Sequence, residues 1–338
     1  MNRTMLLAVT AALTVGLTGC GQGGKDGAVT LLNVSYDPTR ELWKDLNEKF
    51  TAEYEKTTGV PVEIKQSHGG SGSQARAVID GLKADVVTLA LWPDTDKIRE
   101  NKLIHDGWEA RLPNRSLPYV STIVFVVRQG NPKGIHDWQD LVKDGNVEII
   151  TPSPKTSGNG KLSFLAAWGA IITKGGTEAQ AKEFVTKLYG QVPVLDPAAR
   201  GATTTFAQKN IGDVHLTWEN EAYHEIKEFP GLEIVYPKAS FLAEPHVAVV
   251  DGNVDRKGPA ARAAAEEYLK FLYTDEGQQI IGKHHYRPTQ PGAIDKFPQL
   301  KKIDLFPITA FSGGWAEANK KFFGDGGVFD QIYQPKAK

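Results

Sequence analysis

Short apolar runs alternate with amphipathic stretches along most of the chain from Thr30 onward. The apolar run 31–34 predicts a strand, and the fourfold spacing of apolar positions in 38–54 predicts a helix. An alternating run at 60–65 predicts a second strand, followed by a helix whose apolar residues from Ala75 to Leu82 share one face. Further apolar runs predict strands at 86–91, 122–127, 147–150, 214–218, 232–235 and 247–250.

Three later segments carry helix signals. Thr177 and Gln180 form the pattern of a capping box, in which each side chain satisfies the other residue's backbone N–H. The apolar spacing predicts a helix at 260–273 and a shorter one from Asp275. Strands that alternate with helices indicate an α/β fold whose mainly parallel sheets are flanked by helices. With 338 residues, the chain is long enough for two such domains.

The first residues have the pattern of an export signal. Arg3 precedes an apolar run at 5–13 that is too short to span a bilayer and is typical of a secretory signal peptide. This run leads to Leu-Thr-Gly-Cys at 17–20, which resembles a bacterial lipoprotein signal. Residues 1–19 are therefore predicted to be removed, Cys20 to carry lipid, and 20–28 to be a flexible tether. Ordinary signal cleavage beside an incidental cysteine is the alternative.

Composition narrows the class of protein further. Cys20 is the only cysteine, so no disulfide can form within the chain, and stability must come from the core. The formal net charge of −1 gives no basic excess that would indicate nucleic-acid binding. We therefore expect an exported protein that is anchored to a membrane outside the cytoplasm.

Small residues gather at three predicted strand-to-helix junctions, at 67–74, 151–160 and 195–201. Such turns let backbone N–H groups converge at a helix N-terminus, where the helix dipole also favours an anion. Glycine permits the close approach and the unusual dihedral angles that this requires. At the first of these junctions Ser71 is placed to cap the following helix, and elsewhere Asp37 before Pro38 is a favourable N-cap. A plain N-cap turn remains the alternative for any single junction.

Enzyme motifs are weak in this sequence. The stretch 69–73 lacks the final glycine of a nucleophile elbow, the lysine at 161 is not in a P-loop, and no His-Glu-x-x-His metal pattern occurs. No cofactor or metal is therefore expected. A secreted ester hydrolase with Ser71 or Ser157 as nucleophile stays open, and His68 is the histidine near enough in sequence to act as its base. Glu219 and Glu221 are interpreted as helix-start carboxylates.

Several stretches resemble one family, the periplasmic sulfate-binding proteins of ABC importers. They are "LLNVSYDPTREL" (31–42), "QSHGGSG" (66–72), "STIVFVVRQGNPKGIHDWQDL" (121–141), "ARGATTTF" (199–206), "WENEA" (218–222), "LAEPHVAVVD" (242–251), "YRPT" (286–289) and "GGVFDQI" (326–332). The resemblance implies a monomeric type II periplasmic-binding-protein fold that closes two lobes on sulfate or thiosulfate and delivers it to a membrane permease. A receptor for phosphate or molybdate is the alternative within this class.

The resemblance also implies how the anion is held, by neutral donors without a salt bridge. Carried over motif by motif, the donors are the backbone N–H of Asp37, the N–H and hydroxyl of Ser71, the hydroxyl of Ser157, the N–H groups of Gly158, Asn159 and Ala199, and the indole N–H of Trp218. Asn159 departs from the family pattern, which has a second glycine, and whether its side chain narrows or polarises the pocket stays open. His68 and Arg200 are expected beside the site without direct contact, and the Asp37 carboxylate is assigned to local capping.

The same resemblance sets the expected domain boundaries. Lobe one is predicted to comprise 29–118 and 247–312, and lobe two 119–246. The two crossovers are expected near 117–122 and 244–247, and 313–338 is expected to form a helical tail. Asp37 and Ser71 then belong to lobe one and the other proposed donors to lobe two, so the anion would lie between the lobes, and binding would drive hinge closure.

Overall fold

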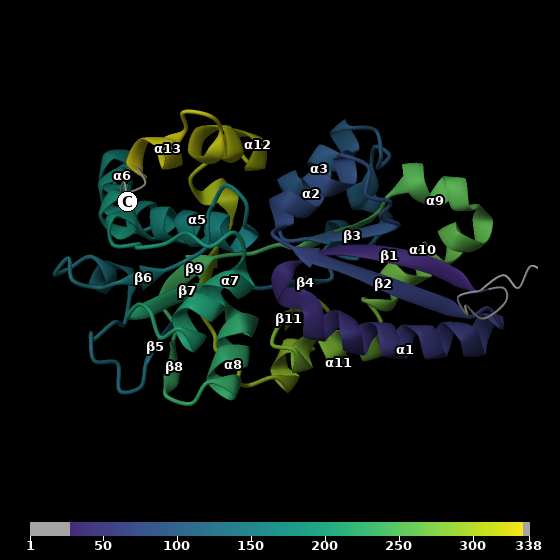
Figure 1. Cartoon of the computed structure of the whole chain (residues 1–338), viewed down its shortest axis with the longest axis horizontal. Coiled ribbons are helices and arrows are strands. Elements are labelled where there is room, and N and C mark those ends of the chain that lie inside the picture. The colour runs from purple at the N-terminus through teal and green to yellow at the C-terminus, as the bar shows by residue number, and fades with distance from the viewer. Residues whose placement is uncertain (1–27, 334–338) are drawn as a thin grey trace, which may run out of the picture.

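The computed structural model of the chain describes residues 28–333. The predicted signal peptide, Cys20 and nearly all of the predicted tether lie outside the described residues. Within the described part, two α/β lobes lie side by side along the long axis of the molecule (Figure 1). No helix of that part is both long and apolar enough to cross a membrane.

Lobe one is built on a four-stranded sheet with the order β10-β3-β1-β2. Strand β1 is parallel to both β2 and β3, whereas β10 runs antiparallel to β3. The strand bounds are β1 Val29–Tyr36, β2 Val62–Gly69, β3 Val86–Leu89 and β10 His246–Val249. Adjacent residues Val86 and Val87 belong to different apolar clusters on opposite faces of this sheet. Because both faces are buried, every residue of β3 is buried and all but Thr88 are apolar.

Helices cover both faces of this sheet, with α2 and α3 on one side and α1 and α11 on the other (Figure 1). Their bounds are α1 Arg40–Thr58, α2 Ser71–Ile79, α3 Trp92–Glu100, α9 Asp251–Lys257, α10 Pro259–Phe271 and α11 Asp275–Lys283. A short 3-10 turn, Asp37–Thr39, precedes α1. The helices predicted at 38–54 and 260–273 are thus present with shifted ends, and α11 begins at Asp275 as predicted.

Lobe two has a sheet of the order β6-β7-β5-β8. Its strands are β5 Ile123–Arg128, β6 Ile149–Ile150, β7 Val214–Trp218 and β8 Leu232–Val235. Only the β6–β7 pair is parallel among these strands, because β5 runs antiparallel to both β7 and β8. The mainly parallel arrangement expected from the sequence therefore holds for lobe one, while lobe two is more mixed, since β5 enters it directly from lobe one.

Two helices of lobe two, α5 Gly158–Ile172 and α7 Ala199–Thr203, begin at the predicted junctions of small residues. The lobe also contains α6 Glu178–Gly190 and α8 Glu219–Glu228. The capping box of α6 is confirmed, because the side chains of Thr177 and Gln180 each bond the other residue's backbone. Figure 1 shows α5 and α7 on the side of lobe two that faces lobe one.

The segments that join the lobes are hydrogen-bonded to one another. Ser121 and Ala243 exchange N–H···O bonds of 3.0 and 2.9 Å. Strand β4, Tyr119–Val120, pairs with β11, Arg287–Pro288, which lies beside it near the junction (Figure 1). The crossings near 117–122 and 244–247 therefore lie side by side. The segment around β11 packs against the crossing near 117–122.

The C-terminal part of the chain differs from the predicted division at residue 312. Strand β12, Asp304–Phe306, pairs with β9, Ala239–Phe241, of lobe two. The sequence assigned these residues to lobe one, so a third crossing between β11 and β12 was missed. A strand of three residues is too short to reveal its partner through periodicity, and its pairing depends on a remote segment.

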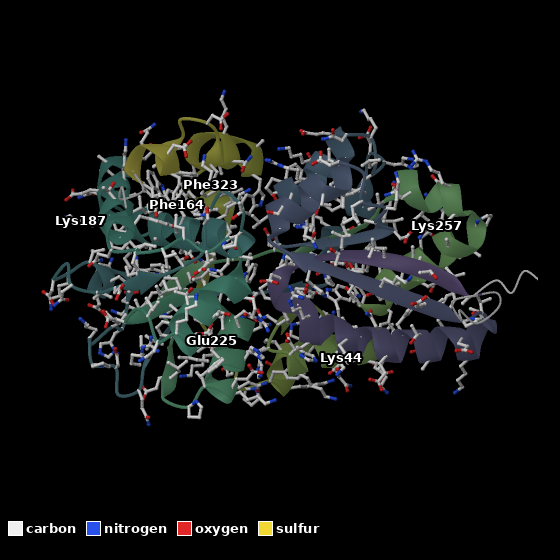
Figure 2. All side chains as sticks on the ribbon, in the orientation of Figure 1. Lys44, Phe164, Lys187, Glu225, Lys257 and Phe323 are labelled. Atoms are coloured by element: carbon white, nitrogen blue, oxygen red, sulfur yellow. The ribbon has the colours of Figure 1, made fainter. Side chains whose placement is uncertain are left out.

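The predicted helical tail packs onto lobe two. It contains α12, Trp315–Ala318, and α13, Val328–Ile332, joined by a π-helical turn at Asn319–Phe323. The ring of Phe164 on α5 lies 5.6 Å from that of Phe322 and 5.4 Å from that of Phe323. Figure 2 shows Phe164 and Phe323 together beneath these last helices. The tail thus completes the apolar core around α5.

Candidate functional site between the lobes

Two helix N-termini meet where the lobes touch, α2 from lobe one and α5 from lobe two. A Cβ atom on Gly158 would lie 2.5 Å from the Cβ of Ala90 and 3.4 Å from the Cβ of Ser71. A Cβ on Gly70 would lie 2.4 Å from the carbonyl oxygen of Thr156. Glycine is therefore required here because the two backbones approach each other closely, which is the physical reason for the glycine-rich junctions.

All the residues predicted to hold the anion are buried along this contact. The exposed fractions are 5% for Asp37, 1% for Ser71, 2% for Ser157, 1% for Asn159, 2% for Ala199 and 0% for Trp218, and Gly158 is also buried. They come from both lobes, as the sequence predicted. The structure thus assembles segments that are up to about 180 residues apart into one enclosed region.

The first turn of α5 provides backbone donors. Gly158 and Asn159 are its first two residues, and N–H groups at these positions have no partner inside the helix. The next N–H, that of Gly160, is 3.5 Å from the Ser157 hydroxyl oxygen, which caps the helix. Since the helix dipole adds positive partial charge at this end, the first turn of α5 favours an anion without any formal cation.

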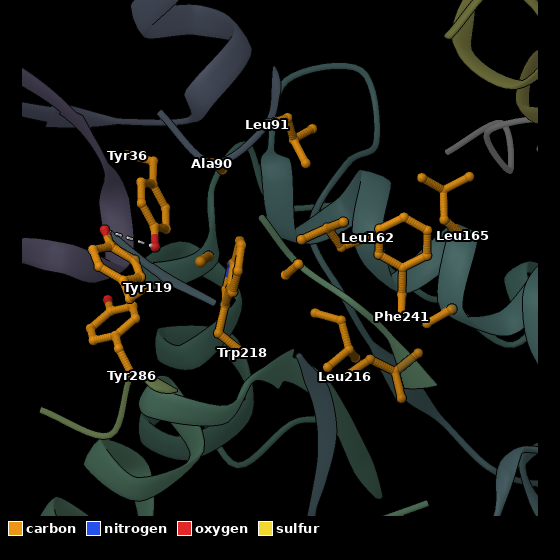
Figure 3. Close-up of a cluster of buried hydrophobic side chains, with 14 of the residues drawn as sticks. Tyr36, Ala90, Leu91, Tyr119, Leu162, Leu165, Leu216, Trp218, Phe241 and Tyr286 are labelled. Carbon is orange, nitrogen blue, oxygen red and sulfur yellow. Dashed lines mark hydrogen bonds between the residues drawn. The ribbon is translucent and has the colours of Figure 1, made fainter. Parts of the chain in front are cut away.

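Trp218 carries a buried donor that is unsatisfied. Its side chain is fully buried, yet its indole N–H has no hydrogen-bond partner among residues 28–333. The indole ring lies 5.2 Å from the ring of Tyr36 in lobe one, beside Tyr119 and Tyr286 (Figure 3). A buried donor without an acceptor costs about 1–3 kcal/mol. Because an indole can only donate, this N–H is available to an acceptor that enters between the lobes.

The hydroxyl of Ser71 is engaged within lobe one. It donates to Asp94 Oδ2 at 2.6 Å and accepts from the N–H of Ala90 at 3.1 Å. The N-cap of α2 is Gly70, so the expectation that Ser71 caps this helix is wrong. Asp94 also faces Lys161 Nζ of lobe two at 3.5 Å. Sequence reasoning missed Asp94, although it follows β3 at the start of α3 and so stands at the strand end where ligands bind.

The carboxylate of Asp37 joins the two lobes. Its Oδ2 accepts the backbone N–H of Arg200 at 2.9 Å, and its Oδ1 accepts from Arg40 at 2.6 Å. The N-cap of the turn at Asp37–Thr39 is Tyr36 and makes no side-chain cap. The expectation that the Asp37 carboxylate caps its own helix is therefore wrong, because one oxygen bonds the Arg40 side chain and the other bonds the backbone of Arg200 across the cleft.

Arg200 lies beside the cleft and pairs with two carboxylates. Its guanidinium is 3.1 Å from Glu41 of lobe one and 3.0 Å from Glu221 of lobe two. Burial raises the pKa of the Glu221 carboxyl to about 8, although the guanidinium opposes this shift. Arg200 thus links the lobes through Glu41, and its charge is directed at carboxylates.

Glu219, the residue after Trp218, bonds Arg287 of β11 and so holds this end of β7 against the segment between the lobes. Glu219 is fully buried and accepts from Arg287 of β11 at 2.7 and 2.8 Å, and from the Tyr236 hydroxyl at 2.8 Å. Glu219 and Glu221 were interpreted from the sequence as helix-start carboxylates that complement the dipole. They begin α8 as expected, but each is also half of a buried ion pair, which no local pattern reveals.

His68 is not paired with a serine. Its Nδ1 lies 3.4 Å from the carbonyl oxygen of Tyr36, and burial lowers the pKa of its imidazole. The hydroxyl of Ser71 bonds Asp94 and Ala90 instead. The serine–histidine hydrogen bond that a nucleophilic hydrolase needs is therefore not formed between these residues. Within residues 28–333 no group of three or more His, Cys, Asp or Glu side chains could hold a metal ion.

The side chain of Asn159 turns toward the lobe-two sheet. Its Nδ2 donates to the carbonyl oxygen of Leu216 at 3.0 Å, and its Oδ1 accepts the backbone N–H of Trp218 at 3.2 Å. This resolves the question that the sequence left open, because the amide is occupied by β7 and not aimed into the contact between the lobes.

Two joined α/β lobes that bury neutral donors where they meet define a solute-binding protein. The chain belongs to the family described as bacterial extracellular solute-binding protein, whose model matches residues 33–287. It is 50% identical to the thiosulfate-binding protein of Pseudomonas aeruginosa over 93% of this chain and 95% of that protein. It is also 50% identical to the sulfate-binding protein of Escherichia coli over 97% of both chains.

A solved structure supports the same relationship. The sulfate-binding protein SubI from Mycobacterium tuberculosis superposes with a TM-score of 0.79 at 30% identity, covering 87% of this chain and 99% of SubI. The two-lobed type II periplasmic-binding-protein fold expected from the sequence is thereby confirmed. These relatives are named for binding sulfate or thiosulfate.

Proposed function

We propose that this protein captures sulfate or thiosulfate between its lobes outside the cytoplasm and delivers the anion to the membrane permease of an ABC importer. The observation that carries the proposal is the unsatisfied indole N–H of Trp218, fully buried where the lobes meet. The sulfate- and thiosulfate-binding relatives at 50% identity support the same class of ligand.

The proposed donor set follows the sequence prediction with one change. In lobe one it comprises the backbone N–H groups of Asp37 and Ser71. In lobe two it comprises the Ser157 hydroxyl, the N–H groups of Gly158, Asn159 and Ala199, and the Trp218 indole. The hydroxyl of Ser71 is left out because its proton is directed at Asp94 at 2.6 Å.

Selectivity against phosphate follows from the same contacts. Near neutral pH, phosphate carries at least one proton and needs a buried acceptor for it, whereas sulfate has no proton. The nearby carboxylates of Asp37 and Asp94 already accept hydrogen bonds from protein groups. A hydroxyl buried without an acceptor costs about 1–3 kcal/mol, so protonated oxyanions are disfavoured.

Export and anchoring complete the proposal. Cleavage before Cys20, lipidation of its thiol and the tether 20–28 would hold a monomeric receptor at the membrane surface near its permease. Metabolic labelling with a radioactive fatty acid tests the anchor, and Cys20→Ala should abolish incorporation. Label retained in that variant would contradict lipidation at this residue.

Calorimetric titration tests the ligand. A lipid-free protein beginning at Ala28 is titrated with sulfate, thiosulfate, phosphate and molybdate. Tight binding of sulfate or thiosulfate with phosphate silent is the expected result, and the ratio of the first two gives the preference. Stronger binding of molybdate or phosphate would overturn the proposal, and so would turnover of a sulfate ester without binding of any anion.

A further inference from the structure

One edge of the lobe-two sheet is covered over only part of its length. Strand β6 pairs with β7 at two positions, Ile149 with Val214 and Ile150 with His215. Beyond these positions β7 continues through Leu216 to Trp218. On the other side, β5 pairs with β7 along its whole length, to Trp218 opposite Ile123. The end of β7 that carries Trp218 therefore has no neighbouring strand on the β6 side among the described residues.

The side chain of Asn159 occupies this gap. Its Oδ1 accepts the N–H of Trp218 at 3.2 Å, and its Nδ2 donates to the C=O of Leu216 at 3.0 Å. Bonds from one group to residues two apart are what a residue of a parallel neighbouring strand makes. The amide of Asn159 thus continues the β6–β7 ladder for one further step.

The amide is itself held in place. Asn159 is 1% exposed, and its Nδ2 also lies 3.2 Å from the hydroxyl oxygen of Ser163, one turn further along α5. The side chain therefore bonds three groups and has little freedom to rotate. Its orientation is fixed by α5 on one side and by β7 on the other.

This arrangement joins the two sources of donors in lobe two. The backbone of Asn159 is in the first turn of α5, beside Gly158, and its side chain holds the backbone of Trp218. On the proposed function, both provide N–H groups to the same anion. We propose that Asn159 is a positioning residue, whose side chain fixes the distance between the α5 donors and the Trp218 indole and so sets affinity and size selectivity.

The proposal rests on the proposed function. It predicts an effect on selectivity between anions that a purely structural role of Asn159 would not give. Donors fixed in a preorganised arrangement favour the anion that fits them. When the link is removed, donors that can move apart should accommodate a larger tetrahedral dianion with less penalty. Selenate is a suitable larger probe, because it has the charge and shape of sulfate.

Asn159→Gly is the main variant, since it removes the side-chain bonds to Leu216, Trp218 and Ser163 and retains the backbone N–H. Asn159→Ala removes the same bonds with a residue that helices favour, so it keeps the test valid if the glycine variant folds poorly. Val185→Ala is the control, because Val185 is fully buried on α6 and is not among the proposed donors. It should lower thermal stability without changing binding.

Two measurements are made on each variant. In the ligand-free protein, amide hydrogen exchange at Trp218 should be at least about tenfold faster in both Asn159 variants than in wild type. In calorimetry, sulfate affinity should fall about tenfold, and the selenate-to-sulfate ratio of dissociation constants should fall by about threefold or more. Unchanged exchange at Trp218, or an equal loss of affinity for both anions, would overturn the positioning role.

Failure of this inference can be distinguished from failure of the proposed function. If wild type bound neither sulfate nor thiosulfate, the proposed function would fall, and with it the role of Asn159 in selectivity. If wild type bound sulfate and the variants matched Val185→Ala in every measurement, only the role of Asn159 would fall.

Discussion

The two faces of the cleft are built from similar groups but differ in how those groups are used. In lobe one, the Ser71 hydroxyl bonds Asp94, and the Asp37 carboxylate bonds Arg40 and the N–H of Arg200. In lobe two, the indole of Trp218 has no partner in the described part of the chain, and the Ser157 hydroxyl oxygen receives one long bond of 3.5 Å. The Ser71 and Asp37 side chains of lobe one are thus bonded to protein, whereas lobe two carries the unpaired indole donor of Trp218.

This difference between the lobes indicates which of them recognises the anion. We expect lobe two to bind the anion first, because its donors gain partners only from a ligand. Lobe one then closes over the anion. It contributes to binding mainly because its backbone at Gly70 and Ser71 comes close to the anion. Contacts such as Arg200 with Glu41, at 3.1 Å across the cleft, stabilise the closed form.

The largest effect is expected from blocking closure. In Gly158→Ala the new Cβ would lie 2.5 Å from the Cβ of Ala90 in lobe one, so the lobes cannot reach the closed contact. Sulfate affinity should fall about a hundredfold or more, which corresponds to a loss of about 2.8 kcal/mol or more of closing interactions. Calorimetry measures the affinity, and small-angle scattering measures whether added sulfate still compacts the protein.

Gly72→Ala is the matched control for this substitution. A Cβ on Gly72 would lie 3.7 Å from Asp94 Oδ1 and 3.8 Å from the Thr156 carbonyl oxygen, which are ordinary contacts. It should bind sulfate within about threefold of wild type, since no group must move. Equal affinities for the two alanine variants would show that the lobes do not close as tightly as the structure indicates.

The second effect is the loss of the free donor in lobe two. Trp218→Phe retains an aromatic ring against Tyr36 and removes the indole N–H. A hydrogen bond to a charged ligand contributes about 1.5–3 kcal/mol, so sulfate affinity should fall by roughly ten- to a hundredfold. Titration calorimetry checks this directly.

Trp43→Phe provides the control, because the indole of Trp43 is also buried but donates to the Ser35 hydroxyl oxygen at 2.9 Å. This variant should lose stability and keep its affinity for sulfate. An affinity unchanged in Trp218→Phe would remove Trp218 from the anion site and break the contrast between the lobes.

A third test compares the two serines across the cleft. Ser157→Ala should weaken sulfate binding by about tenfold, because this hydroxyl is free to donate to the anion. Ser71→Ala should weaken it by only about threefold, because its hydroxyl proton is already used by Asp94. Calorimetry of both variants, with thermal melts to record stability, measures the difference. A larger loss in Ser71→Ala would mean that its hydroxyl leaves Asp94 for the anion, as the sequence first suggested.

Local patterns in the sequence predicted some elements well. Strand β7 has the predicted bounds 214–218, and the capping box at Thr177 is present. The periodicity of apolar residues and capping chemistry are local properties, so they can be read without the rest of the fold. Trp218 was placed at the site by resemblance, and the structure adds its unsatisfied N–H.

The features that sequence reasoning missed depend on contacts between remote segments. The pairing of Asp304–Phe306 with β9 joins residues more than 60 positions apart through a strand of three residues. The bond between Ser71 and Asp94 and the cross-lobe bond of Asp37 exist only once the lobes are assembled. The orientation of the Asn159 amide depends on where β6 ends. No local pattern encodes such distances, so they appear only in the structure.

The smallest expected effect is that of pH on sulfate affinity. It tests whether lobe one shares in recognition of the anion. Between pH 6 and 7, sulfate affinity should change by less than about twofold, because sulfate itself does not titrate there. Burial lowers the pKa of His68 and raises the pKa of Glu221 to about 8, and neither side chain is among the proposed donors. Phosphate should bind roughly ten- to a hundredfold more weakly than sulfate at both pH values, because its proton finds the Asp37 and Asp94 carboxylates already bonded. Competition titrations of sulfate against phosphate at the two pH values measure both quantities. Phosphate binding within threefold of sulfate at pH 6 would mean that one of these carboxylates leaves its protein donor for the ligand, and lobe one would then share in recognition.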